Sequence, residues 1–138
     1  YKNIDFNFLS LDINVGDAKN LSVSIEKQTV DAIITEPYLG PTLHGMLPQD
    51  KIQAVKNELE KLYIESFSEF AKVLRKQGFV VMVFPVFNAR KFVYLDIIEK
   101  IKKIGFSQVS LSESTRSSIL VGNKRDFVIR EIVKFTLN

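Results

Sequence analysis

The sequence contains no cysteine and a single histidine, His44, among its 138 residues. The absence of cysteine excludes disulfides, thiolate zinc sites and thiol nucleophiles, and it fits a reducing compartment, for which we expect the cytoplasm. One histidine cannot form a metal site of two or three histidines, and a Ser-His-Asp triad would have to use His44. We interpret His44 as a surface loop residue and expect no metal site.

Long apolar runs are also missing, since none reaches the roughly 18 residues that a membrane span needs. The first residues do not form a secretory signal. Hydrophobic residues make up 46% and charged residues 25% of the chain, as in a globular protein. The net charge of +3 permits contact with a polyanion without requiring it. We therefore expect one soluble domain over residues 1–138 with no membrane role, and, because it begins at Tyr1, a truncated one.

Strand patterns and helix patterns alternate along the chain. Residues 30–35 (VDAIIT) and 79–84 (FVVMVF) are short apolar runs, which predict strands buried on both faces. Residues 49–77 carry apolar side chains at spacings of three and four, which predicts a long helix. Residues 91–104 predict a second helix by the same criterion.

Two glycines and a change of pattern mark the rest of the chain. Gly78 and Gly105 follow the two predicted helices, and each can take the left-handed conformation that ends a helix. The tail then becomes β-like over residues 106–111, 118–121 and 129–137. Residues 122–126 (GNKRD) predict the turn that joins the last two of these segments.

The alternation predicts an α/β fold: a mostly parallel sheet with helices on both faces and a C-terminal antiparallel hairpin. Residues 6–11 could lead into a further strand. Ligands of such sheets bind outside the carboxyl ends of the strands. Three loops are predicted at such ends, and we expect them to line one crevice: residues 16–20, 35–41 and 85–90.

The segment T-E-P-Y-L-G-P, which follows the first predicted strand, resembles motif IV of the amino methyltransferases, usually written D/N/S-P-P-Y/F. The resemblance implies a catalytic role for three residues. Glu36 and the carbonyl of Pro37 would accept hydrogen bonds from an exocyclic amino group of a nucleobase, and Tyr38 would stack on the flipped base. Leu39 and Gly40 would line the same substrate site.

The segment G-D-A-K-N-L resembles the G-D-A-x-x-L stretch that precedes motif IV in the same families. The resemblance implies that Asp17 accepts a hydrogen bond from the adenine amino group of S-adenosylmethionine. The backbone N–H of Ala18 would reach a ring nitrogen.

Together with the closing stretches R-S-S-I-L-V and R-E-I-V, these motifs are similar to those of the THUMP-associated RNA guanine-N2 methyltransferases. The similarity covers nearly the whole chain. It implies a Rossmann-like class I methyltransferase fold, S-adenosylmethionine as cofactor and RNA, first of all tRNA, as partner. A homodimer is a further expectation, because a sheet cut short would expose an edge strand.

The chain departs from the family pattern in two ways. Glu36 stands in place of Asp, Asn or Ser, and only one proline follows it, so the target nitrogen would lie further out. No G-x-G-x-x-G motif is present. We therefore expect the N-terminal glycine-rich unit of the fold to lie upstream, and the 138 residues alone to be inactive.

Two residues after the second predicted strand are candidates for substrate binding. Phe87 could border a base pocket. Arg90, with Lys91, begins a predicted helix, where a cation is unfavourable unless it meets an anion such as phosphate.

Four other interpretations remain open. The segment 36–38 could be an ordinary strand exit, and Asp17 could merely form an Asx-turn. The same motif would serve a DNA adenine-N6 or cytosine-N4 methylase. The altered motif IV also suits a non-catalytic Rossmann-like module that binds RNA or a partner.

Overall fold

The computed structural model describes residues 10–42, 45, 48–111, 117–123 and 125–138. His44 and nearly all of the segment 6–11 lie outside this part of the chain. The elements, in chain order, are η2 (Leu21–Val23), β1 (Val30–Thr35), α1 (Gln49–Val73), β2 (Leu74–Asn88), β3 (Phe92–Val93), α2 (Ile98–Ile104), β4 (Phe106–Val109), β5 (Ser118–Val121) and β6 (Val128–Leu137).

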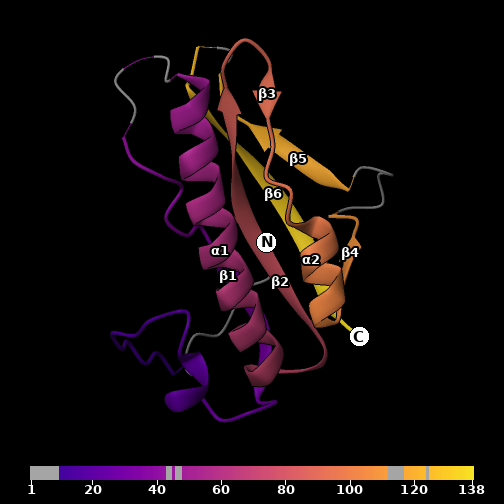
Figure 1. The fold of residues 1–138 in the computed structure, drawn as a ribbon. Helices are drawn as coiled ribbons and strands as arrows, with labels where there is room; N and C mark the ends of the chain where they lie inside the picture. Colours follow the sequence, from indigo (N-terminus) through magenta and orange to yellow (C-terminus); the bar gives the residue numbers. More distant parts are fainter. Residues whose placement is uncertain (1–9, 43–44, 46–47, 112–116, 124) are drawn as a thin grey trace, which may run out of the picture.

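The strands form one mixed sheet in the order β1-β2-β6-β4, in which β3 pairs with β2 and β5 pairs with β6 (Figure 1). β1 and β2 are parallel and are joined by α1, as predicted. The other described pairings are antiparallel, including the C-terminal hairpin of β5 and β6. The expectation of a mostly parallel sheet is therefore wrong. The cause is β6, which lies beside β2 in the opposite direction and pairs antiparallel with β4 and β5 as well.

Both α-helices, α1 and α2, lie on the same face of the sheet, and neither covers the other face (Figure 1). The prediction of helices on both faces is thus corrected, because the connections through α1 and α2 pass on one side. β2 accordingly alternates: Val80, Met82 and Phe84 are buried against the helices, while the residues between them are half-buried. On β1, Ile34 is 76% exposed.

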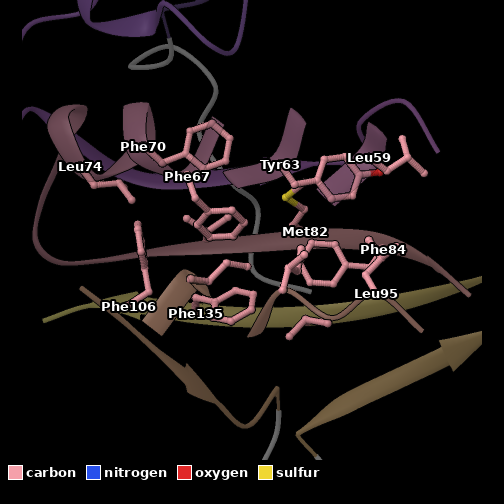
Figure 2. Close-up of a cluster of buried hydrophobic side chains, with 14 of the residues drawn as sticks. Leu59, Tyr63, Phe67, Phe70, Leu74, Met82, Phe84, Leu95, Phe106 and Phe135 are labelled. Carbon is pink, nitrogen blue, oxygen red and sulfur yellow. The ribbon is translucent and has the colours of Figure 1, made fainter. Parts of the chain in front are cut away.

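An aromatic cluster fixes α1 on the sheet (Figure 2). The ring of Phe67 lies 5.1 Å from that of Phe106 and 5.2 Å from that of Phe135. Tyr63 stacks on Phe84 at 5.6 Å. Such pairs each contribute about 0.5–1.5 kcal/mol beyond the burial of their area. The cluster therefore holds the second half of α1 against β2, β4 and β6.

The turn between α1 and β2 is tighter than predicted. α1 ends at Val73, not near residue 77, and β2 begins at the next residue. Gln77, at φ 63°, takes the left-handed conformation expected of Gly78. Gly78 is needed for another reason, because a Cβ there would lie 2.8 Å from the carbonyl oxygen of Arg75.

The second helix is shorter than predicted. It begins at Ile98, and the preceding residues form β3 and a connection that buries Leu95 and Ile97. Gly105, at φ 121°, ends the helix as expected. Among the described helices, none combines the length and apolar character that crossing a membrane requires.

Candidate functional site

The T-E-P-Y-L-G-P loop leaves the carboxyl end of β1 and runs toward the start of α1. Thr35, the last residue of β1, pairs with Met82, and β2 continues to Asn88 at the same edge of the sheet. Pro37 lacks the N–H that would extend the ladder, so the strand stops there. The loop thus lies where open α/β sheets place their ligands.

The backbone of this loop is held by α1. The buried Tyr63 hydroxyl donates a 2.6 Å hydrogen bond to the carbonyl of Tyr38. Burial raises the pKa of Tyr63, so its hydroxyl remains a donor throughout the neutral range. Gly40 sits at φ 104°, and a Cβ there would come within 3.1 Å of Val55 Cγ1. The loop path is fixed, while the side chain of Tyr38 remains 53% exposed.

Glu36 is oriented by a residue distant in the sequence. Its Oε1 accepts a 2.9 Å hydrogen bond from Arg130 Nε, and both side chains are about half exposed. No described residue donates a hydrogen bond to Oε2 of Glu36 or to the carbonyl of Pro37. Two acceptor groups therefore remain available on this loop. Nothing in the sequence pairs Glu36 with Arg130, because the contact depends on the antiparallel register that sets Arg130 opposite Pro85.

An open cavity of about 490 Å³ adjoins the loop. Leu39 and Gly40, the predicted substrate contacts, lie in its wall. Its other described lining residues are Pro41, Thr42, Arg125, Asp126, Phe127, Val128 and Arg130.

A second cavity, of about 720 Å³, lies at the same edge of the sheet. Its described lining residues are Pro48, Gln49, Ile52, Ala89, Arg90, Lys91 and Val93. The side chain and backbone N–H of Asn88 bond to the carbonyls of Asp126 and Phe127, at 3.0 and 2.8 Å. The end of β2 thereby joins the walls of the two cavities.

Two predictions at the end of β2 are corrected. Phe87 is only 2% exposed and packs in the core beneath Gly40, so its ring does not border an open pocket. It is buried because β2 continues to Asn88, beyond the predicted strand end at residue 84. Arg90 and Lys91 do not begin a helix; they form the turn between β2 and β3, and both are exposed.

Asp17 does not lie near Glu36. Its carboxylate accepts a 2.9 Å bond from the N–H of Lys19, which is the geometry of an Asx-turn. The segment that follows is anchored near the C-terminal end of α1, where the Ser22 N–H and hydroxyl bond to Glu69. Figure 1 shows this indigo segment at the opposite end of α1 from the 36–42 loop.

The expected crevice therefore brings together two of its three loops. Residues 35–41 and 85–90 share one edge of the sheet, while residues 16–20 lie elsewhere because no strand forms in residues 10–29. Ala18 is exposed beside Asp17. Within the described ranges, no three acidic, histidine or cysteine side chains gather in a way that could hold a metal ion.

The chain matches no family model and no curated protein. Its fold is similar to that of TTHA0409 from Thermus thermophilus, named as a "Putative DNA Modification Methylase". One structure of that protein is 20% identical, with a TM-score of 0.57 over 89% of this chain and 52% of that chain. Its selenomethionine derivative is 14% identical, with a TM-score of 0.56 over 88% of this chain and 50% of that chain. Its complex with S-adenosyl-L-methionine is 19% identical, with a TM-score of 0.52 over 89% of this chain and 51% of that chain.

At these identities the similarity shows the fold alone. It shows that the mixed sheet and its two helices have the arrangement of part of a methylase structure. The chain spans about half the length of the structures it matches.

Proposed function

We propose that the chain forms the acceptor side of an S-adenosylmethionine-dependent methyltransferase, located in the cytoplasm, that modifies an exocyclic amino group of a nucleobase. The target that we propose is the N2 amino group of guanine in tRNA. The observation that carries the proposal is the loop at the carboxyl end of β1, where Oε2 of Glu36 and the Pro37 carbonyl accept no hydrogen bond from a described residue and Leu39, Gly40 and Arg130 line an open cavity.

The chemistry follows from the needs of an exocyclic amine. Its lone pair is delocalised into the base ring, so it is a poor nucleophile. Oε2 of Glu36 and the carbonyl of Pro37 can accept hydrogen bonds from its two N–H groups, which turns the lone pair toward an incoming methyl group. Both acceptors stabilise the positive charge that develops on nitrogen. When bound, S-adenosylmethionine supplies the methyl group.

Other residues of the edge position the substrate. Arg130 holds the Glu36 carboxylate, and Tyr63 holds the loop backbone. The half-exposed ring of Tyr38 is free to stack on the base, and Leu39 and Gly40 line the adjacent cavity.

The residues present fit the acceptor half of such a site and not the whole cofactor half. The Asp17 carboxylate is about half exposed and chemically suited to accept an adenine amino group, but it lies away from the loop. The sequence has no glycine-rich phosphate or nucleoside cradle. Contacts of Asp17 and Ala18 with the cofactor therefore stay a prediction, for which Asp17→Asn should weaken cofactor binding by the full-length protein in calorimetry.

Methyl transfer tests the proposal directly. We expect the full-length protein to incorporate labelled methyl groups from S-adenosylmethionine into unmodified tRNA. Glu36→Ala should lower the initial rate by about 100-fold or more, the usual effect of removing one preorganised polar group from a reaction centre. The matched control is Glu58→Ala, an exposed α1 residue with no ion pair among the described residues. Equal rates for the two variants would contradict the role of Glu36.

DNA is the second candidate substrate, and the fold shared with a protein named as a DNA modification methylase favours it. A parallel assay with duplex and single-stranded DNA separates the two. Incorporation into DNA alone would replace RNA in the proposal. A protein that binds nucleic acid without any incorporation would instead be the non-catalytic module.

A further inference from the structure

Three basic side chains at the carboxyl edge of β2 have no acidic partner. Arg90, Lys91 and Arg125 form no ion pair with any residue that the structure describes. Asp126 accepts a 2.7 Å bond from the N–H of Asn123, and Glu36 is paired with Arg130. The exposed Asp50, in the first turn of α1, offsets only one of the three positive charges. The edge therefore carries uncompensated positive charge.

The 720 Å³ cavity suits an anion next to an apolar group. Arg90 and Lys91 line it from the β2–β3 turn, and Ile52 and Val93 supply apolar wall. The first turn of the 25-residue helix α1 forms the opposite wall, and its cap, Pro48, provides no side-chain hydrogen bond. The free N–H groups and the helix dipole add to the positive potential that the two side chains create.

The 490 Å³ cavity also combines a basic side chain with an apolar wall. Arg125 lies in its wall beside the 37% exposed ring of Phe127. A second ring, Phe92, is 43% exposed next to Lys91. The Asn88 hydrogen bonds fix the two cavity walls to each other. Cations alternating with exposed aromatic rings along a groove are typical of surfaces that bind unpaired nucleotides, with phosphates on the cations and bases on the rings.

We propose that the carboxyl edge of β2 is a binding track for a single-stranded segment of nucleic acid. Arg90 and Lys91 bind one phosphate group, Arg125 binds another, and Phe127 stacks on a base between them. The track passes beside Glu36 and would deliver the target base to it. The proposal rests on the proposed function for this delivery, but not for the binding itself.

Binding without cofactor tests the track. The probes are fluorescein-labelled, mixed-sequence, 12-nucleotide single strands of RNA and of DNA, and an RNA duplex is the third ligand. Binding is measured by fluorescence anisotropy over a range of salt concentrations. The triple variant Arg90→Gln, Lys91→Gln, Arg125→Gln should lose about 10-fold or more in affinity. It should also flatten the slope of log K against log salt by about 1.4, since two phosphate contacts are lost and each single-strand contact contributes roughly 0.7.

The control variant removes the same charge elsewhere: Lys27→Gln, Lys76→Gln, Lys103→Gln, three exposed residues without ion pairs among the described residues. It should change neither the affinity nor the salt slope appreciably. Phe127→Ala should lower the affinity about 10-fold with an unchanged slope, because stacking does not release counterions. Circular dichroism verifies that each variant is folded.

Three results would overturn the track: equal losses in the two triple variants, no loss in either, or tighter binding of the duplex. The RNA and DNA arms identify which strand is preferred. Normal single-strand binding in a protein that transfers no methyl group would support the track while contradicting the enzymatic function, so the two proposals fail separately.

Discussion

At the scale of single residues, the hydroxyl of Tyr63 connects the core to the candidate site. Its ring lies in the aromatic cluster, and its oxygen holds the carbonyl of Tyr38. The candidate residues Glu36, Pro37 and Tyr38 could be proposed from the sequence because the motif that they resemble is local. Tyr63 and Arg130 were not, since an apolar stripe does not reveal which hydroxyl bonds to a loop, and Arg130 is 94 residues from its partner.

Tyr63→Phe tests this connection. The substitution leaves the Tyr38 carbonyl without its protein donor, so we expect a loss of about 1–2 kcal/mol in the free energy of unfolding measured with urea. Tyr94→Phe is the control, because Tyr94 is 40% exposed and its hydroxyl bonds to no described group. A Tyr63 variant as stable as the Tyr94 variant would show that the bond does not hold the loop.

At the scale of elements, α1 holds two other segments of the chain in place through carboxylates on its surface. Near its end, Glu69 accepts hydrogen bonds from Ser22 and pairs with Lys72, which attaches η2 to the helix. In its first half, Glu60 accepts a 2.7 Å bond from the N–H of Asp96 and pairs with Lys100 at 3.2 Å, which attaches the connection to α2. Carboxylates on one helix thus position segments on either side of it.

The acid stability of the fold should depend on Glu69. The Lys72 ammonium first, and then the Ser22 N–H and hydroxyl, lower the pKa of Glu69 to about 2 from an ordinary 4.5. Because the folded pKa is depressed, the stabilisation is complete above pH 4.5 and is lost as the pH falls toward 2. Glu69→Gln should therefore melt below the wild type at pH 7, by a difference that disappears near pH 2.

Thermal melts followed by circular dichroism between pH 7 and pH 2 measure this difference. Glu65→Gln is the matched control, because Glu65 lies on the same helix and has only a 4.0 Å pair with the exposed Lys61. A difference between Glu69→Gln and wild type that stays constant with pH would contradict the assignment.

The long helix and the first strand could be predicted because their patterns are long or bounded by clear breakers. The ends of β2 and the start of α2 could not. Helical spacing continues through Phe92, Leu95, Ile98 and Ile101. Phe92 nevertheless lies in β3, because Phe92–Val93 pairs with the end of β2 in a hairpin. Tertiary pairing, which no local pattern encodes, decided these boundaries.

At the scale of the whole molecule, the class of fold was predictable and the strand directions were not. Alternating apolar segments predict a sheet with crossover helices, but they do not say that β6 inserts beside β2 or that both helices share one face. β1 has a single described neighbour, β2, so its other edge is unpaired within the described residues. A homodimer through this edge stays a prediction.

The central claim is that the loop after β1 presents a target amine to a methyl donor. Mass spectrometry of digested nucleosides tests it most directly, after incubation of the full-length protein with unmodified tRNA and deuterated S-adenosylmethionine. We predict deuterated N2-methylguanosine from the wild type and almost none from Glu36→Ala. A tRNA in which no base carries the label, or labelling that persists undiminished in the Glu36 variant, would contradict the account.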